Sequence, residues 1–240
     1  MKDIIDLHTH TIASGHAYST LSENAAAAKC HGLKILGVSD HAPQMPGAAH
    51  LFYFRNLHVI PETLQGVRIL KGAELNILDC EGRVDLDEKT LEQLDYAIAS
   101  LHVPCYSPQH SCQQNTAALI AAAHHPRVKI LGHPDDSRFP IDQRAVAEAC
   151  LQTRTLIEVN NSSLSPHSSR SGGWENMRSM LQHCAELKVP VLFGSDAHFC
   201  EQIGRFDLCR QLCAEVGFPG ELIVNDQPER IQEFFGLMIR

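Results

Sequence analysis

The chain contains fifteen histidines but only four tyrosines and one tryptophan, and the placement of the histidines indicates chemistry. His8 and His10 lie two residues apart at the end of an apolar run, so both side chains point to the same side of an extended strand. Asp196 and His198 repeat this spacing near the other end of the chain. Imidazoles and carboxylates that converge in this way are typical ligands of transition-metal ions.

Further potential ligands follow the other apolar runs of the sequence. His41, Glu74, His102 and His133 each stand at the end of one run, and His16 lies in the loop after the first. Such groups, buried together, would repel one another and lack partners unless a cation neutralised them. A metal cluster is therefore the simplest interpretation of the pattern.

These ligands require strands and helices that bring them together. The apolar runs predict seven strands, at Ile4–His8, Ile35–Ser39, Ile69–Ile77, Tyr96–Leu101, Val128–Gly132, Leu156–Val159 and Val191–Gly194. Helices are predicted between them, for example from Ser22 to Gly32 and from Asp142 to Cys150. This alternation predicts an α/β fold with parallel strands, whose carboxyl ends meet at one face, where α/β barrels hold their active sites. We expect a single domain over residues 1–240.

The composition indicates which binding partners and which cellular compartment to expect. The net charge of −8 and the lack of a basic stripe argue against nucleic-acid binding. No segment has the pattern of a signal peptide or a membrane span, so we expect no membrane partner. The nine cysteines are scattered and form no Cys-x-x-Cys pair, which favours reduced thiols and a cytoplasmic location. Cys209 and Cys213 are predicted to face the core from one helix.

The order of these motifs resembles the PHP family, named for polymerase and histidinol phosphatase. The resemblance covers essentially the whole chain and is carried by Asp6–His10, Ser39–His41, Gly72–Glu74, Ser100–His102, Gly132–Pro134, Glu158–Asn161 and Gly194–His198. Two stretches, His16–Thr20 and Glu158–Ser163, are similar to the YcdX-type phosphatase subgroup. The resemblance implies a distorted seven-stranded (β/α)7 barrel and a homo-oligomer, which is a trimer in the family.

The resemblance also implies a trinuclear metal site. The first ion would be held by His8, His10, Glu74 and Asp196, the second by Glu74, His102 and His133, and the third by His16, His41 and His198. Glu74 would bridge two ions. Glu74 and Asp196 are the expected catalytic residues of this site. The imidazole-rich set favours zinc, with manganese or iron as alternatives. A metal-bound hydroxide would then remove phosphate from a small phosphomonoester.

Residues outside the ligand set have expected roles too. Asp40 lies on the opposite side of its strand from His41, so we expect a structural hydrogen bond rather than ligation. The Ser/Gly-rich loop 166–173 is a candidate mobile lid. It carries Ser168, Ser169 and Arg170 just before a helix that begins near Gly173, and we expect these side chains to bind phosphate, with Arg170 as the clamp.

Two acids stand where a phosphate-binding site would not favour them. Asp135 and Asp136 follow His133, and their charge would oppose a phosphate or select a cationic group on the substrate.

Three other functions use the same residues. A phosphodiesterase or nuclease would need the same metals, and a metal-dependent amidohydrolase would cleave C–N bonds instead. A non-catalytic metal-binding protein is the third alternative, although it has no need of ligands at the open end of a barrel.

Overall fold

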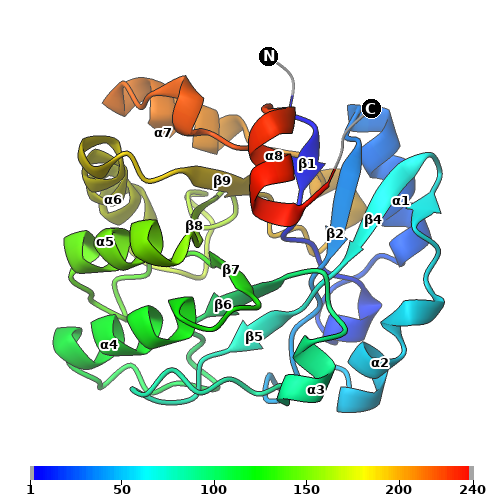
Figure 1. Ribbon diagram of the computed structural model, residues 1–240, viewed down its shortest axis with the longest axis horizontal. Helices are drawn as coiled ribbons and strands as arrows, with labels where there is room; N and C mark the ends of the chain where they lie inside the picture. Colours follow the sequence, from blue (N-terminus) through cyan, green and yellow to red (C-terminus); the bar gives the residue numbers. More distant parts are fainter. Residues whose placement is uncertain (1–2, 238–240) are drawn as a thin grey trace.

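The computed structural model describes residues 3–237, whose strands form two sheets (Figure 1). The first has the order β1-β2-β4-β3 and the second β5-β6-β7-β8-β9, and every pair is parallel except β3 with β4. The strands are β1 (Ile5–Asp6), β2 (Ile35–Val38), β3 (Thr63–Leu64), β4 (Val67–Lys71), β5 (Glu74–Asn76), β6 (Ala97–Ser100), β7 (Val128–Leu131), β8 (Leu156–Asn160) and β9 (Val191–Gly194).

Helices connect most of these strands. The α-helices are α1 (Leu21–His31), α2 (Leu51–Arg55), α3 (Glu88–Leu91), α4 (Cys112–Ala123), α5 (Gln143–Thr153), α6 (Gly173–Leu187), α7 (Asp207–Val216) and α8 (Pro228–Phe235). Short 3-10 helices are η1 (Ile12–Ser14), η2 (Leu57–Val59), η3 (Cys200–Gln202) and η4 (Gly220–Leu222). The two predicted helices are confirmed as α1, with a capping box between Thr20 and Glu23, and α5, capped by Asp142.

Two isolated bridges join the sheets into a distorted barrel. A parallel bridge between His41 and Glu74 links the segment after β2 to β5, and a second between Thr9 and Ala197 links the segments after β1 and β9. The strands therefore follow one another around a closed circuit in which β4 and β5 occupy a single position. The predicted (β/α)7 architecture is confirmed.

The predicted strand Ile69–Ile77 is wrong as one continuous element. Its residues form β4 and β5, which belong to different sheets, and the break falls at Gly72 and Ala73. A Cβ on Gly72 would lie 2.5 Å from the ring of Tyr96, so this glycine lets the tyrosine occupy the barrel interior. The Tyr96 hydroxyl donates to the Leu7 carbonyl at 2.5 Å. The large interior side chain thus accompanies the local distortion of the barrel wall.

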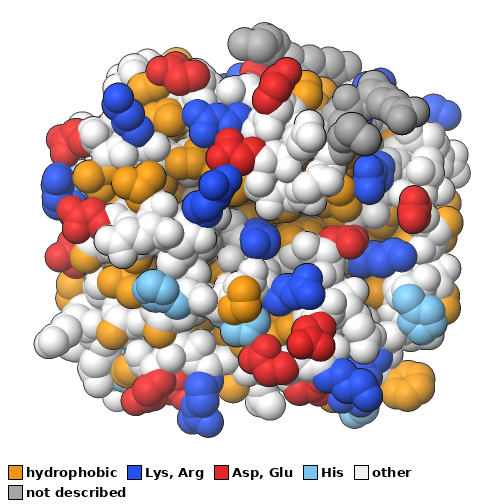
Figure 2. Space-filling model, viewed as in Figure 1, with side chains coloured by type: hydrophobic (Ala, Val, Ile, Leu, Met, Phe, Trp, Pro, Cys, Tyr) orange, Lys and Arg blue, Asp and Glu red, His pale blue; other side chains and the backbone are white. Residues whose placement is uncertain are grey.

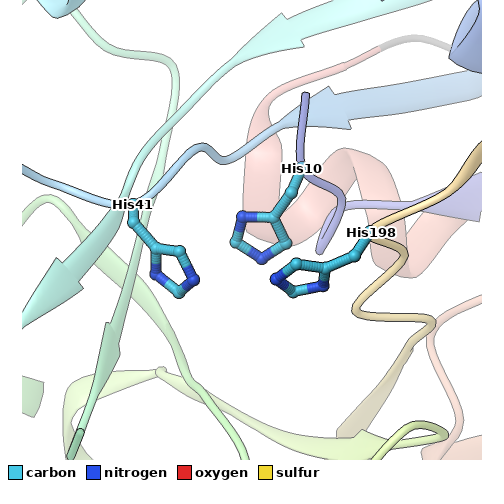
Figure 3. Close-up of side chains that lie close together, drawn as sticks. All are labelled: His10, His41 and His198. Atoms are coloured by element: carbon cyan, nitrogen blue, oxygen red, sulfur yellow. The ribbon is translucent and has the colours of Figure 1, made fainter. Parts of the chain in front are cut away.

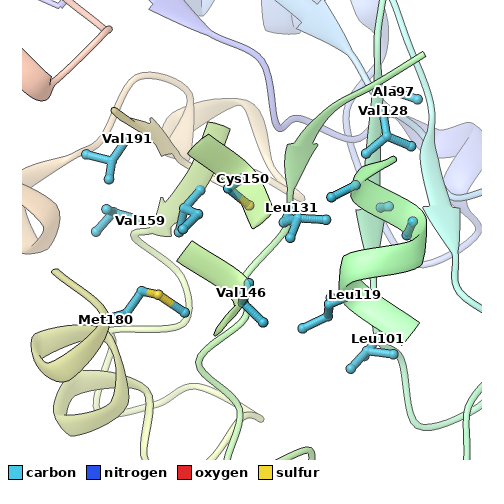
Figure 4. Close-up of a cluster of buried hydrophobic side chains, with 14 of the residues drawn as sticks. Ala97, Leu101, Leu119, Val128, Leu131, Val146, Cys150, Val159, Met180 and Val191 are labelled. Carbon is cyan, nitrogen blue, oxygen red and sulfur yellow. The ribbon is translucent and has the colours of Figure 1, made fainter. Parts of the chain in front are cut away.

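Hydrophobic side chains fill both sides of the barrel wall. Inside, residues of β1, β2, β4 and β6 to β9 pack around Tyr96, and Ile231 of α8 joins them, so α8 covers this end of the barrel (Figure 1). Outside, a larger cluster lies between the five-stranded sheet and the adjacent helices α4, α5 and α6 (Figure 4). Cys209 and Cys213 of α7 are buried in this outer cluster, as predicted. The opposite end of the barrel is left for the polar strand ends.

The surface shows no concentration of one charge on the face seen in Figure 2, where basic and acidic side chains are interspersed. Within residues 3–237, no helix combines the length and the apolar character needed to cross a membrane.

Candidate metal centre

The side chains at the carboxyl ends of the strands converge in four overlapping groups of potential metal ligands. These are His8 with His10 and Asp196, His8 with Glu74 and His133, His41 with Glu74 and His102, and His10 with His41 and His198. Within each group the ligand atoms lie within 4.8 Å of one another. Eight of the nine predicted ligands are therefore brought together, from both ends of the sequence.

Three of the histidines face one another at one side of this cluster (Figure 3). The ring of His10 stacks on those of His41 and His198, with centroids 4.4 and 4.2 Å apart. The predicted third ligand of this group, His16, is exposed and enters none of the four groups. Its ring nevertheless stacks 4.9 Å from those of both His41 and His198. His16 thus borders this group from the solvent side.

Glu74 lies at the centre of the cluster and is fully buried. Its Oε1 is 3.1 Å from His102 Nε2 and 2.9 Å from His133 Nε2. Its Oε2 is 2.8 Å from His41 Nδ1. The two oxygens thus point to different histidines, which is the arrangement that a bridging carboxylate requires.

Five polar atoms in this cluster are buried and form no hydrogen bond of acceptable geometry with the described residues, although Glu74 Oε2 and His41 Nδ1 lie close to each other. The five atoms are His8 Nε2, His10 Nε2, His41 Nδ1, Glu74 Oε2 and Asp196 Oδ1. Buried polar atoms are rarely left unpaired, because each costs about 1–3 kcal/mol of desolvation without compensation. Because all five are metal-ligating atoms and point to one region, the residues fit a cluster of transition-metal ions.

The electrostatics keep the acids ionised. Burial opposes the charge on Glu74, but His8, His102 and His41 outweigh it and hold the pKa of Glu74 well below its usual range. The same competition, with His8 and Arg170 as the main positive neighbours, holds the pKa of Asp196 well below its usual range. Both carboxylates are therefore anionic, the form that binds metal.

Burial and neighbouring charges shift the pKa values of His10 and His102 in one direction and that of His8 in the other. Burial lowers the pKa of His102 to about 4, and burial followed by the charges of His41 and His198 lowers that of His10 well below its usual range. These imidazoles are neutral and offer a lone pair. Burial also acts against a charge on His8, but the carboxylates of Glu158, Glu74 and Asp196 outweigh it and raise its pKa. A metal ion must therefore displace a proton from His8.

Buried acceptors outside the predicted ligand set orient the imidazoles. His8 Nδ1 lies 2.6 Å from Glu158 Oε1, and His102 Nδ1 lies 2.7 Å from Asn76 Oδ1. Each bond engages Nδ1 and leaves Nε2 directed at the cluster. Metal-binding histidines are usually oriented in this way, by a hydrogen bond at the ring nitrogen that does not bind the metal. Sequence reasoning missed the roles of Glu158 and Asn76. The available signal was a polar side chain inside a buried apolar strand.

Asp40 has the structural role expected of it. Its carboxylate accepts hydrogen bonds from the backbone and hydroxyl of Thr11, from the hydroxyl of Ser14 at 2.7 Å and from that of Tyr53 at 2.6 Å. The Ser14 hydroxyl oxygen lies 3.0 Å from His10 Nδ1. Asp40 therefore fixes the orientation of His10 through Ser14.

Two of the predicted ligands have left-handed backbone conformations. His133 has φ +30° and Asp196 has φ +54°. Such conformations are unfavourable for side chains other than glycine and persist where surrounding contacts impose them, often at functional sites. At His133 the backbone N–H donates to Glu158 Oε2 at 2.8 Å, so the carboxylate that orients His8 also holds this turn.

A pocket of about 390 Å³ adjoins the cluster, and we call it the metal pocket. Its wall includes His16, His41, His102, Asp196 and His198. The predicted phosphate-binding residues Arg170 and Ser169 also line it, but Ser168 does not and faces pockets on the other side of the loop.

Arg170 is tied to a predicted metal ligand. Its Nη1 donates to Asp196 Oδ2 at 3.0 Å, whereas Asp196 Oδ1 is the atom without a partner. The remaining N–H groups of this guanidinium are not hydrogen-bonded to the described residues, and the side chain borders the pocket. Arg170 can therefore hold Asp196 and contact an anion at the same time.

The loop that carries Arg170 is fixed at its carboxyl end. Ser137 N donates to Ser171 O at 2.8 Å. On the amino side of the loop, the Ser163 hydroxyl donates to Asp135 Oδ1 at 2.6 Å. Asn176 of α6 adds bonds to the Asp135 carbonyl and the Ser137 hydroxyl. These contacts argue against the expected mobile lid for this part of the loop. They also explain the placement of Asp135, which is buried and has its pKa raised to about 6, mainly by burial.

Asp136 is paired with an arginine that sequence reasoning did not select. Arg138 donates from Nε to both oxygens of Asp136, at 3.0 and 2.9 Å, and from Nη2 to one of them. Both side chains line the metal pocket. Because the pair is neutral overall, Asp136 does not oppose a phosphate as the isolated acid would. The pairing depends on the turn after β7, which the sequence alone did not reveal.

Comparisons with known proteins agree with this geometry. A family model described as the PHP domain matches residues 6–165. A probable phosphatase of Caldanaerobacter subterraneus subsp. tengcongensis is 46% identical over 234 residues, which cover 98% of this chain and 91% of that relative. A probable phosphatase of Clostridium acetobutylicum is 44% identical over 234 residues, which cover 98% of this chain and 95% of that relative.

A solved structure shares the fold. The histidinol phosphate phosphatase of Lactococcus lactis subsp. lactis, in complex with zinc, L-histidinol and phosphate, has a TM-score of 0.61 and 14% identity. The superposition covers 91% of this chain and 95% of that one. At this identity the likeness concerns the fold alone. Because the family model matches well over half of the chain and the relatives cover nearly all of it, the chain belongs to the PHP domain family.

Proposed function

We propose that the protein is a metal-dependent phosphatase that hydrolyses a small phosphomonoester. The observation that carries the proposal is the set of five buried, unpaired ligand atoms beside a pocket lined by Arg170. The relatives named as probable phosphatases support the reaction class. The finer assignment to the YcdX-type subgroup remains a prediction.

The proposed centre holds three divalent ions. His8, His10 and Asp196 form one group, and Glu74, with an oxygen directed at each side, joins two further groups that include His102 and His133. His41 and His198 form the last with His10, and His16 borders it. Imidazole-rich ligation favours zinc, with manganese or iron as alternatives. The zinc in the Lactococcus lactis structure supports the same choice.

The bound ions would supply two chemical functions, since divalent metals acidify water and stabilise negative charge on phosphoryl oxygens. The chain's own residues provide the positioning. Glu158 and Asn76 orient His8 and His102, and Arg170 holds Asp196 while its free N–H groups face the pocket. Ser169 lines the same wall. We propose that Arg170 and Ser169 bind the non-bridging oxygens of the phosphate.

A substrate panel tests the function directly. The metal-supplemented protein would be assayed with nitrophenyl phosphate, with the diester bis(nitrophenyl) phosphate and with an amide, an acyl nitroanilide. We expect the monoester to have the highest kcat/KM. A preference for the diester would favour the phosphodiesterase or nuclease alternative, and a preference for the amide would favour an amidohydrolase. No hydrolysis of any of them with zinc, manganese or iron would contradict the proposal.

A further inference from the structure

A second polar pocket lies beside the metal pocket, and the proposed reaction leaves it without a role. Its volume is about 290 Å³, and it shares Ser162 and Gln202 with the wall of the metal pocket. Both volumes suit part of a small ligand, because small-molecule sites usually span roughly 300–1,000 Å³. The two pockets therefore adjoin at these two side chains.

One loop lines both pockets with different residues. Ser169 and Arg170 line the metal pocket, whereas Ser165, His167 and Ser168 line the second pocket. This division explains why Ser168, although adjacent to Ser169, does not lie beside the metal centre. The hydroxyl and imidazole groups give the second pocket several hydrogen-bond donors.

Arg205 supplies the only formal charge among the side chains that line the second pocket, apart from any proton on His167. Among residues 3–237, no aspartate or glutamate side chain lines it. Arg205 lies between η3 and α7, and its guanidinium makes no hydrogen bond or ion pair within residues 3–237. Asp207, two residues further on, does not pair with it. The pocket therefore presents an uncompensated cation.

Arg205 differs in this respect from most other arginines of the protein. Arg138 and Arg170, in the neighbouring metal pocket, are bound to Asp136 and Asp196. In the described part of the chain, Arg68 and Arg127 also lack a carboxylate partner, but Arg127 donates to the Leu94 carbonyl and neither residue lines either pocket. A guanidinium that keeps its donors free, beside serine hydroxyls and away from acids, favours a carboxylate or phosphate as its ligand.

We propose that the second pocket binds an additional anionic group of the substrate, a carboxylate or a second phosphate, while the phosphate to be removed lies at the metal centre. The inference rests on the proposed phosphatase function and adds its substrate class. Arg205, an exposed side chain at this pocket, is the specificity-determining residue, because its guanidinium can form a charge-assisted hydrogen bond with an anionic substrate group but not with a neutral one. Ser168 and His167 contribute hydrogen bonds to the same anion.

Matched substrates test this proposal. Glycerol phosphate would be compared with phosphoglycerate, and adenosine monophosphate with adenosine bisphosphate, using the metal-loaded wild type, Arg205→Gln and the control Arg68→Gln. We expect at least one doubly anionic substrate to have a kcat/KM roughly ten- to a hundredfold above its partner, as expected for a charge-assisted hydrogen bond. Arg205→Gln should lose this advantage, mainly through a higher KM, and keep the wild-type kinetics on the singly anionic substrates. Arg68→Gln should change neither the advantage of the second anion nor the kinetics on the singly anionic substrates.

The outcomes separate this proposal from the function on which it rests. Better hydrolysis of phosphoglycerate would assign a carboxylate to the pocket, and better hydrolysis of the bisphosphate would assign a phosphate. If the wild type hydrolyses the singly anionic esters and gains nothing from the second anion in either pair, the subsite is wrong and the phosphatase stands. The subsite is also wrong if Arg205→Gln loses kcat/KM equally on singly and doubly anionic substrates. If the wild type hydrolyses none of the esters, the proposed function itself fails.

Discussion

At the residue scale, the carboxylate of Glu158 holds two of the predicted metal ligands in place. Glu158 accepts from His8 through one oxygen and from the His133 backbone through the other, and Asn160 donates to the second oxygen at 3.0 Å. A Cβ on Gly194 would lie 1.9 Å from Glu158 Oε1, so the glycine leaves room for this carboxylate. Glu158 thereby couples two predicted ligands from different strands.

Glu158→Gln should weaken metal binding without removing a ligand. The amide keeps the size of the side chain but loses the charge that orients and polarises His8, and changes of this kind typically cost about 10–100-fold in metal affinity or activity. Competition with a chromophoric chelator would measure the affinity, with the exposed Glu201→Gln as the control. Unchanged affinity in Glu158→Gln would show that the contact with His8 is dispensable.

Glu74→Gln should harm activity more than His16→Ala. Glu74 lies within 3.5 Å of five histidines and offers one oxygen to each side of the cluster, whereas His16 is exposed and lies outside the four ligand groups. Phosphomonoester hydrolysis at saturating metal would compare the two variants. A larger loss in His16→Ala would reverse this ranking, and wild-type rates in Glu74→Gln would show that Glu74 does not bridge.

Arg170→Ala should lower kcat/KM by roughly ten- to a hundredfold, the equivalent of one charge-assisted hydrogen bond. Arg170→Lys keeps the charge but cannot contact Asp196 and a phosphate with a planar fork, so we expect only partial recovery. Steady-state kinetics at saturating metal, with metal content measured in parallel, would test this. Kinetics within about twofold of wild type for Arg170→Ala would leave phosphate binding to the metals and Ser169.

The sequence predicted the metal ligands better than it predicted the residues that orient them or pair with their neighbours. His8 and His133 were identifiable because each is a polar residue at the end of an apolar run, and Glu74 because it is an acid directly after Gly72 and Ala73. The role of Glu158 was not, because its partner His8 lies 150 residues away and only the closed barrel brings them together. The pairing of Asp136 with Arg138 depended in the same way on a turn conformation.

Strand continuity is the main difference between prediction and structure at the element scale. The run from Ile69 to Ile77 contains Lys71, Glu74 and Asn76, but polar residues also occur inside the continuous strands, so they did not mark the break between β4 and β5. The break depends on Tyr96, which packs against Gly72 and lies close to Gly37 as well. The break thus coincides with long-range packing of one aromatic side chain, which the local sequence does not reveal.

Gly72→Ala should destabilise the fold by about 1–3 kcal/mol, because the new methyl group overlaps the Tyr96 ring in a packed interior. Gly220→Ala is the matched control, since no atom lies within 4 Å of its added Cβ. Urea unfolding would give both free energies. Equal stabilities of the two variants would mean that the barrel accommodates the methyl group without strain.

The metal centre connects the parts of the barrel at the scale of the whole molecule. Its predicted ligands follow β1, β2, β6, β7 and β9 or begin β5, so bound ions would link strands from both sheets. Ligands that bind the folded state alone stabilise it, by about 2.7 kcal/mol at a hundredfold excess over the dissociation constant. Metal loading should therefore affect folding as well as activity.

The single domain over residues 1–240 and the trimeric state remain predictions, and sedimentation would test the latter.

The most direct test is a metal titration of the metal-free protein in which bound ions, Tm and phosphate release from a phosphomonoester are followed together. We expect Tm and hydrolysis to rise with zinc, manganese or iron, and hydrolysis to reach its maximum near three ions per chain, because all five unpaired ligand atoms then have partners. Full activity in the metal-free protein, or fewer than two tightly bound ions with every metal tested, would contradict the account.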